Sequence, residues 1–290
     1  MQQKKFTVIG GDLRNLILAN LLVKEYHKVE IFGFKNSSFD TELIEKQGIE
    51  EAIHNSDVVI GPLPCSNDNE TLNAPFHPGR IYINDVFKQL KKSQIFLGGH
   101  ISEKLLHLSE INNVYTIDYL KREEMAVLNA IPTSEGAIQI AMEELPITLH
   151  GCKSMILGFG RIGKTLAKML TGLGCKVYVE ARKYSDIAWI KNYGYIPVHI
   201  EQLEDYLNGM EVVFNTIPNI ILDSKQLKNI NKECLIIDLA SKPGGVDLEQ
   251  AKTMGLKTIW ALSLPGKVAP LTAAQAIKET VYNILSELGV

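Results

Sequence analysis

The sequence lacks an apolar run long enough to cross a lipid bilayer, and its longest apolar stretches have only the length of a strand. Its N-terminus also lacks the long apolar segment and small-residue cleavage site of a secretory signal. Positive charge is not in excess, since 30 Lys and Arg stand against 33 Asp and Glu, which argues against a nucleic-acid surface. We therefore expect a cytoplasmic protein that binds neither membranes nor nucleic acid.

Cysteine is scarce, because the chain has four, far apart and without any CxxC pair. This spacing argues against a zinc site and a disulfide framework, so we expect free thiols in a reducing compartment and no bound metal. The rest of the composition, with 46% apolar and 22% charged residues, is ordinary for a globular protein. A length of 290 residues suits two domains.

Short β-rich runs alternate with helical stretches along the whole chain, which is the pattern of parallel sheets joined by crossover helices. Both halves open with a strand, a glycine-containing turn and a helix, at GGD (10–12) and at GFGRIG (158–163). The predicted fold class is α/β, with two Rossmann-like, doubly wound parallel-sheet domains and an interdomain cleft. The strands are expected at residues 6–10, 29–34, 57–61, 95–99, 114–118, 154–158, 176–180, 195–198, 211–216, 234–240 and 257–262.

The segment of residues 128–153 separates the two halves and is interpreted as a connector. Pro132 suits the first turn of a helix, which Thr133 or Ser134 would cap. We therefore expect a helix to begin there and to continue over GAIQIAMEEL, residues 136–145.

The connector divides the chain into an N-terminal α/β substrate domain, residues 1–128, and a dinucleotide-binding Rossmann domain, residues 129–271. The final stretch, residues 272–290, has apolar positions at helical spacing. This helix is expected either to cover the second domain or to cross back to the first. Closing a cleft between the domains would exclude water from a hydride transfer.

The turn GFGRIG has glycines at the spacing of a dinucleotide-binding turn. It follows an apolar strand and opens a helix, which is the context that this motif requires. The first glycine allows a tight turn, the second lets the backbone approach a pyrophosphate, and the third lets the helix pack closely on the strand. The residues expected at the pyrophosphate are Gly158, Phe159, Gly160, Arg161, Ile162 and Gly163.

The choice of cofactor depends on the next strand, within VYVEARKYS (177–185). Glu180 is the acidic residue, about 20 positions after the turn, that would bind the ribose hydroxyls of NAD, but we expect it within the strand. Arg182 and Lys183 follow the strand end, and two cations suit the 2′-phosphate of NADP, which a carboxylate would repel. NADP is therefore favoured over NAD, and an ordinary solvated loop is the alternative interpretation of the two cations.

Two later strands end in residues suited to a cofactor groove, at FNTIPN (214–219) and DLASKPGG (238–245). Ligands in open α/β sheets collect at the carboxyl ends of strands. For Asp238, capping of a loop or helix is the alternative role. The residues expected to border the ribose and nicotinamide are Asn215, Thr216, Ile217, Pro218, Asp238, Ala240 and Ser241.

Six segments form a specific combination, namely GGDLR (10–14), IPTSEGAIQIAM (131–142), ILGFGRIG (156–163), NTIP (215–218), DLASKPGG (238–245) and LPGKVAPLTA (264–273). Together they resemble the family of dipicolinate synthase A subunits, the NADP-binding component of that enzyme in spore-forming bacteria. The resemblance extends from residue 6 to the end of the chain. The last segment is also similar to one in alanine dehydrogenases and transhydrogenases, and the layout is similar to that of 2-hydroxy-acid dehydrogenases.

The resemblance implies an enzyme that oxidises dihydrodipicolinate, a dihydropyridine dicarboxylate beside lysine biosynthesis, to dipicolinate during sporulation. Aromatisation drives the reaction, and NADP accepts the hydride. The resemblance also implies a partner, the flavoprotein-like B subunit of dipicolinate synthase, and a location in the cytoplasm of the mother cell. Cleft-type dehydrogenases are commonly dimers or larger, so we also expect a homo-oligomer.

A dicarboxylate substrate requires cations or helix N-termini. Arg14 follows Gly10-Gly11-Asp12 at the start of the first expected helix, where backbone N–H groups would meet one carboxylate. Solvated surface cations and simple helix caps are the alternative roles for residues of this kind. The substrate-binding candidates are Gly11, Arg14, Ser134, Lys242 and Thr272.

Removal of a ring proton requires a base near the nicotinamide, and histidine is the usual one. All seven histidines lie at or before His199, so the late acid/base histidine of the 2-hydroxy-acid dehydrogenases is absent. The catalytic candidates are His100, which is the best placed because it follows an expected strand, together with Glu135 and Lys267. Two alternatives stay open: a dehydrogenase of another small amino or keto acid, and a non-catalytic, NADP-binding regulatory subunit.

Overall fold

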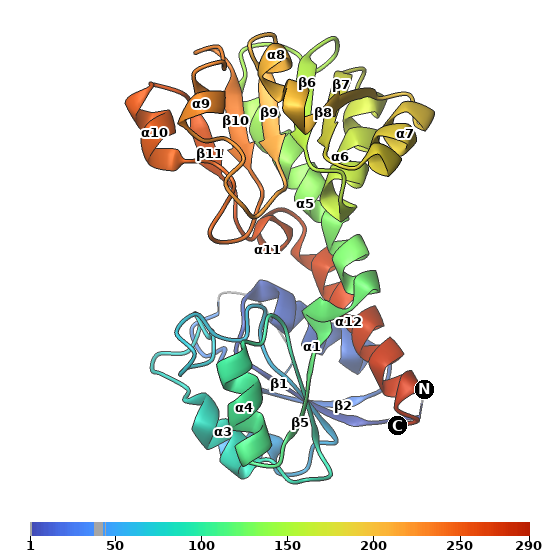
Figure 1. Cartoon of the computed structure of the whole chain (residues 1–290). Helices are drawn as coiled ribbons and strands as arrows, with labels where there is room; N and C mark the ends of the chain where they lie inside the picture. Colours follow the sequence, from blue (N-terminus) through green and yellow to red (C-terminus); the bar gives the residue numbers. More distant parts are fainter. Residues whose placement is uncertain (1, 38–42, 44) are drawn as a thin grey trace. The chain divides into compact units, whose positions relative to one another are not determined.

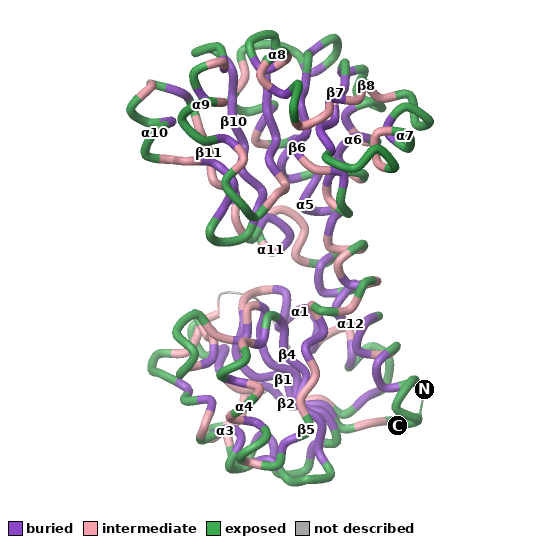
Figure 2. Tube along the Cα trace, in the orientation of Figure 1, coloured by how far each residue is buried: buried purple, intermediate pink, exposed green. Residues whose placement is uncertain are grey.

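The structure, a computed structural model, describes residues 2–37, 43 and 45–290. Its internal contacts divide the chain into two compact units (Figure 1). Unit 1 consists of Met1–Leu128 and Ala269–Val290, and unit 2 consists of Asn129–Val268. In each unit, buried residues follow the strands and exposed residues lie mainly on the surrounding helices and loops (Figure 2).

Unit 1 contains a parallel five-stranded sheet with the order β2-β1-β3-β4-β5. This is the order of a doubly wound, flavodoxin-like sheet, whose connections reverse direction between β1 and β3. The strands are β1 (Lys5–Ile9), β2 (Lys28–Phe32), β3 (Val58–Ile60), β4 (Ile95–Gly98) and β5 (Tyr115–Asp118). The helices are α1 (Leu13–Lys24), α2 (Ile49–Ile53), α3 (Ile83–Gln89), α4 (Glu103–Ile111), the short 3-10 turn η1 (Tyr119–Lys121) and α12 (Pro270–Glu287).

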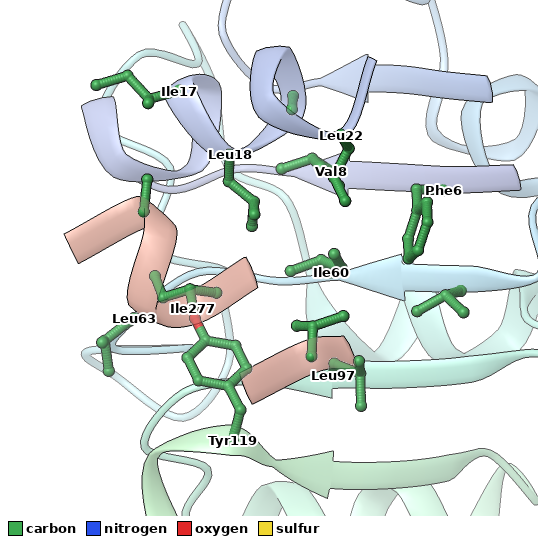
Figure 3. Packing of buried hydrophobic residues seen from close by; sticks show 14 of the residues in the cluster. Phe6, Val8, Ile17, Leu18, Leu22, Ile60, Leu63, Leu97, Tyr119 and Ile277 are labelled. Carbon is green, nitrogen blue, oxygen red and sulfur yellow. The ribbon is translucent and has the colours of Figure 1, made fainter. Parts of the chain in front are cut away.

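Strand residues of unit 1 alternate between two apolar clusters, as the two-residue period of a strand requires. On β1, Phe6 and Val8 belong to the cluster that includes α1 and α12, whereas Ile9 belongs to the cluster that includes α2 and α3. Figure 3 shows the first cluster, in which Ile277 of α12 packs with Leu18 of α1. The last helix of the chain is therefore part of the core of unit 1.

Unit 2 contains a parallel six-stranded sheet with the order β11-β10-β9-β6-β7-β8. Counted from β6, this is the strand order of a Rossmann fold, whose connections reverse direction between β6 and β9. The strands are β6 (Lys153–Leu157), β7 (Lys176–Ala181), β8 (Ile196–His199), β9 (Val212–Asn215), β10 (Leu235–Asp238) and β11 (Thr258–Trp260). The helices are α6 (Arg161–Gly172), α7 (Tyr184–Asn192), the 3-10 turn η2 (Ile200–Gln202), α8 (Leu203–Leu207), α9 (Ser224–Leu227), α10 (Leu248–Thr253) and α11 (Leu264–Val268).

The predicted α/β class, with two Rossmann-like parallel sheets, is confirmed, and a strand is present at every position where the sequence predicts one. The helix of the connector differs from its prediction. Helix α5 (Glu123–Glu144) begins well before Pro132, which lies inside it. Proline has no N–H for the helical ladder, but the hydroxyls of Thr133 and Ser134 donate to the carbonyls of Asn129 and Ala130 within this stretch. These two residues therefore lie within the helix and do not cap its start.

Candidate functional site

The glycine-rich turn between β6 and α6 has the geometry that each glycine of the motif predicts. Gly158 has a φ of 95°, a left-handed conformation that disfavours any residue with a Cβ atom. A Cβ atom added to Gly163 would collide with the carbonyl oxygen of Gly158, so the helix packs against the strand as closely as it can. A Cβ atom added to Gly160 would meet no atom within 4 Å. The space in front of Gly160 is therefore open to an approaching phosphate.

Helix α6 begins directly after this open glycine. Gly160 is its N-cap, and no side chain caps the first turn. The N–H groups of a helix start carry partial positive charge and bind phosphate readily. Phe159 is buried, Ile162 is half-buried and Arg161 is exposed at this turn. The residues present therefore fit the pyrophosphate of a dinucleotide.

Glu180 lies one residue before the end of β7, and its side chain is turned toward the glycine-rich turn. Its Oε2 atom accepts a hydrogen bond from the N–H of Gly158 at 3.2 Å. The side chain is buried, and its Oε1 atom has no hydrogen-bond partner. Burial raises the pKa of the Glu180 carboxyl, while the Gly158 N–H and the charge of Arg182 act in the opposite direction.

The strand β7 ends at Ala181, and the two cations follow it. Arg182 and Lys183 are both exposed, so their charges are available at the carboxyl edge of the sheet. The carbonyl of Arg182 lies 3.1 Å from Nε2 of His199, the last residue of the neighbouring strand β8. The ring of Tyr184 stacks on that imidazole, with ring centroids 5.0 Å apart. His199 and Tyr184 were not among the predicted site residues, although a polar residue at the end of β8 was the available signal.

Asn215 and Asp238 end the neighbouring strands β9 and β10, and both are buried. The amide of Asn215 donates to the Asp238 carboxylate at 2.8 Å. The same carboxylate accepts from the N–H groups of Ala240 at 3.0 Å and Gly245 at 2.9 Å. Asn215 also bonds the N–H and the carbonyl of Ile217. These two side chains therefore hold the loops after β9 and β10 in place.

The loops that Asn215 and Asp238 hold present the other predicted cofactor residues. Thr216 donates its hydroxyl to the carbonyl of Leu157 at 2.8 Å, which joins its loop to the glycine-rich turn. Thr216 and Ile217 are half-buried and Pro218 is exposed. In the loop after β10, Ala240 is buried and accepts the Trp260 indole N–H, whereas Ser241 and Lys242 are exposed.

In unit 1, the turn after β1 uses its polar groups internally. The N–H of Gly11 donates to the carbonyl of Asn73 at 2.8 Å, and the side chain of Asn15 fills the space in front of Gly11. Arg14 is only 4% exposed, and its guanidinium bonds the Asp12 carboxylate and the carbonyl of Leu63. Asp12 caps α1. These contacts hold the turn in place, and the role of Gly11 and Arg14 in binding a substrate carboxylate stays a prediction.

His100 follows strand β4 in unit 1, and its side chain is exposed. Its backbone has a φ of 56°, in the left-handed region. Its N–H donates to Oδ1 of Asp118 at 2.9 Å, and the next N–H, of Ile101, donates to Oδ2 at 2.8 Å. Asp118 was not among the predicted site residues, although it ends the neighbouring strand β5.

The remaining candidates lie on helices. On α5, Ser134 is fully buried, so the structure gives its hydroxyl a role inside the helix, whereas Glu135 is exposed. Lys267 on α11 and Thr272 on α12 are exposed. Across residues 2–37, 43 and 45–290, no three His, Cys, Asp or Glu residues are grouped as a metal site requires. Over the same ranges, none of the helices combines the length and the apolar character needed to span a bilayer.

Two family models match the chain. The model of the N-terminal domain of the dipicolinate synthase A subunit matches residues 5–120, and that of the D-isomer specific 2-hydroxyacid dehydrogenase NAD binding domain matches residues 130–246. The dipicolinate synthase A subunit of Bacillus subtilis (strain 168) is 30% identical over 286 residues, which cover 98% of this chain and 96% of that protein. The chain belongs to the family of dipicolinate synthase A subunits.

Solved structures of this family have the same fold as the chain. The dipicolinate synthase A chain from Bacillus subtilis superposes with a TM-score of 0.89 at 29% identity and covers 100% of this chain and 98% of its own. The dipicolinate synthase A subunit from Bacillus halodurans superposes with a TM-score of 0.90 at 28% identity, over 97% of both chains. The predicted family is thus confirmed. Because unit 2 matches a dehydrogenase domain, the chain is an oxidoreductase that uses a nicotinamide dinucleotide.

Proposed function

We propose that the chain is the oxidoreductase subunit of a dipicolinate synthase, which oxidises dihydrodipicolinate to dipicolinate in sporulation with NADP as the hydride acceptor. The observation that carries this proposal is the 30% identity to a dipicolinate synthase A subunit over 98% of the chain. Following the name of that relative, the proposal includes a partner chain, which the resemblance gives as the flavoprotein-like B subunit of the enzyme. It also includes assembly of several copies of the chain.

Oxidation of the dihydropyridine ring removes one hydride and one proton, and the ring becomes aromatic. The bound oxidised nicotinamide supplies the acceptor of the hydride. In unit 2, Gly160 and the first turn of α6 hold the pyrophosphate. His100 of unit 1, with its exposed imidazole, accepts the proton. Lys242 and Thr272 are exposed and are the proposed contacts for the substrate carboxylates. Glu135 and Lys267, also exposed, are the other candidates for proton transfer.

Three features of unit 2 favour NADP over NAD. The carboxylate of Glu180 is buried and bonded to the Gly158 N–H. The strand ends on Ala181, which has no polar group for a ribose hydroxyl. Arg182 is exposed directly after it, and a guanidinium matches the oxygens of a 2′-phosphate.

A titration of the purified chain with NADPH and NADH tests the cofactor. We expect NADPH to bind at least about tenfold more tightly, a difference of about 1.4 kcal/mol. Arg182→Ala should remove this preference, whereas Arg80→Ala, at another exposed arginine, should keep it. Equal or tighter binding of NADH by the wild-type chain would overturn the choice of NADP.

An assay of product formation tests the reaction. The dihydropyridine substrate is made in the assay from aspartate semialdehyde and pyruvate by the enzyme that condenses them. Dipicolinate and NADPH are measured as they form, with and without the partner subunit. We expect both products in equal amounts. Turnover of another small amino or keto acid in place of this substrate would favour a different dehydrogenase. Binding of NADPH without turnover under either condition would favour a regulatory subunit.

A further inference from the structure

At the carboxyl edge of the unit 1 sheet, backbone hydrogen bonds connect the loops next to His100. The strand β4 ends at Gly98, and a Cβ atom on Gly99, the next residue, would lie 2.6 Å from Leu63 and 2.7 Å from Tyr119. The Gly99 carbonyl accepts the N–H of Cys65 at 2.6 Å, and its N–H donates to the carbonyl of Pro62 at 3.0 Å. The loops after β3 and β4 therefore hold each other. His100 is the first residue after β4 whose side chain is exposed.

The backbone of His100 is held in a conformation that it does not favour. A φ of 56° is uncommon for a residue with a side chain, and a glycine would adopt it without strain. Such strain persists only where the surroundings fix it, and it gathers at functional sites. The surroundings therefore fix the backbone from which the exposed imidazole of His100 extends.

Asp118 provides the fixing contacts. One of its carboxylate oxygens binds the N–H of His100 at 2.9 Å, and the other binds the N–H of Ile101 at 2.8 Å. Asp118 is only 7% exposed, so water does not compete freely for these bonds. The carboxylate also accepts a hydrogen bond from the N–H of Leu120, so Asp118 caps the short turn η1 after β5. Asp118 thus joins the end of β5 to the backbone on which the imidazole is mounted.

We propose that Asp118 is a positioning residue that holds the His100 imidazole in the orientation from which it accepts the proton of the substrate. Asp118 acts through the backbone N–H groups of His100 and Ile101 and does not itself touch the substrate. This inference rests on the proposed function, because it takes His100 as the proton acceptor.

The test is a double-mutant cycle with His100→Gly and Asp118→Ala, measured with NADP and dihydrodipicolinate in the presence of the partner subunit. Glycine keeps the left-handed backbone and removes the ring. We expect His100→Gly to lower kcat by about 100-fold, which is the low end for a lost general base. Asp118→Ala should lower kcat about tenfold or more with little change in KM, as expected for lost hydrogen bonds to a charged group. The double variant should be no slower than His100→Gly alone. Added imidazole should raise the kcat of His100→Gly and of the double variant to the same value.

A matched control and a second variant separate positioning from folding. Asp68 also accepts two backbone N–H groups, from Glu70 at 2.9 Å and Thr71 at 2.8 Å, but none from His100. Asp68→Asn should therefore leave kcat unchanged. If Asp118→Ala does not fold, Asp118→Asn keeps the size of the side chain. Faster hydrogen exchange at the His100 and Ile101 amides in the Asp118 variant, with the Asp68 variant unchanged, would support the proposal.

If the fold-losses in kcat of the two single variants multiply in the double variant, Asp118 acts independently of the imidazole. That result would overturn the inference and leave the proposed function standing. An Asp118 variant that folds and keeps the wild-type kcat would do the same. Full activity of His100→Gly would overturn the inference together with the assignment of His100. No turnover by the wild-type chain with its partner would overturn the inference and the proposed function together.

Discussion

The Glu180 carboxylate accepts a hydrogen bond from the Gly158 N–H at 3.2 Å, which links the end of β7 to the glycine-rich turn of unit 2. Because the carboxyl is buried and one of its oxygens has no partner, the folded protein disfavours its charged form. The pKa of Glu180 is accordingly raised from its ordinary value of 4.5 by burial. The folded chain therefore keeps this proton to a higher pH than the unfolded chain does.

Glu180→Gln should stabilise the protein at pH 8 and lose this advantage as the pH falls toward 4.5, the ordinary value for Glu180. In the wild-type chain, stability declines as the pH rises through the window above that value, because the unfolded state releases the proton first. The amide keeps an acceptor for the Gly158 N–H and carries no charge. Thermal unfolding at several pH values measures the effect. Each kcal/mol added to the free energy of unfolding raises Tm by about 2–4 °C.

Glu233→Gln is the control for Glu180→Gln, because Glu233 is an exposed glutamate of the same unit. Its Tm should follow that of the wild-type chain at every pH. A Glu180→Gln variant that is less stable than the wild-type chain at pH 8 would mean that the Gly158 bond needs the full charge. In that case Glu180 would be a ribose-binding residue held ready as a carboxylate, and the preference for NADP would lose one of its three supports.

Substituting two glycines of the same turn should give opposite results. Gly160→Ala adds a methyl group where no atom lies within 4 Å, so stability should fall by less than about 1 kcal/mol, as expected at an N-cap. In the proposed complex, that methyl group would lie in the path of the pyrophosphate and should weaken NADPH binding at least about tenfold. Gly163→Ala should instead lower the free energy of unfolding by about 1–3 kcal/mol, because its methyl group meets the Gly158 carbonyl.

Denaturant unfolding and NADPH titration, applied to both alanine variants of the turn, separate these effects. The predicted pattern is a stable variant that binds poorly at Gly160 and a destabilised variant at Gly163. Wild-type affinity for NADPH in Gly160→Ala would contradict the assignment of this turn to the pyrophosphate. No described atom of the chain lies within 4 Å of the new methyl group, so a bound pyrophosphate is what it would obstruct.

The fold was predictable because strands and glycine-rich turns are local features of the sequence. Strands such as those ending at Asn215 and Asp238 are short apolar runs, and their ends carry the polar residues that meet at one edge of the sheet. The start of α5 was not predictable in the same way. The prediction placed Pro132 in a first helical turn, but residues from Glu123 onward already form helix, so the proline lies in its interior.

The roles of single polar residues depended on contacts between distant segments, which the sequence does not reveal. The sequence does not reveal, for example, that the guanidinium of Arg14, a predicted substrate-binding residue, bonds the carbonyl of Leu63, which lies 49 positions away along the chain. The role of Asp118 depends on the neighbouring loop after β4 in the same way. At Gly160, by contrast, the motif itself predicts the open space, so the prediction and the geometry agree.

Ile277→Ala should destabilise unit 1. Ile277 is fully buried on α12 and packs in the same cluster as Leu18 of α1 (Figure 3). Truncating such a side chain leaves a cavity and costs about 2–5 kcal/mol. Hydrogen exchange should become faster in α1 and stay unchanged in β6 of unit 2. Leu271→Ala, on the same helix but 50% exposed, is the control and should change little. Equal effects of the two substitutions would contradict the placement of α12 in the core of unit 1.

His27 should make unit 1 sensitive to acid. The residue is buried, and its ring forms T-shaped contacts with Phe6 and Tyr282, with centroids 5.0 and 5.8 Å away. Its Nδ1 accepts the N–H of Lys4 at 3.1 Å. Burial lowers the pKa of His27 from its ordinary value of 6.5, although the charge of Glu25 acts in the opposite direction. Below pH 6.5 the unfolded chain takes up a proton that the folded chain resists, so the free energy of unfolding falls as the pH falls.

His27→Gln tests this directly, because the glutamine side chain offers an oxygen to the Lys4 N–H but does not take up a proton. Between pH 7.5 and pH 5, the free energy of unfolding of the variant should fall less than that of the wild-type chain. His54→Gln, at an exposed histidine of the same unit, should keep the wild-type slope. If His27→Gln also keeps that slope, the imidazole must be protonated in the folded state, with the Lys4 N–H released and the Glu25 carboxylate close enough to balance the charge.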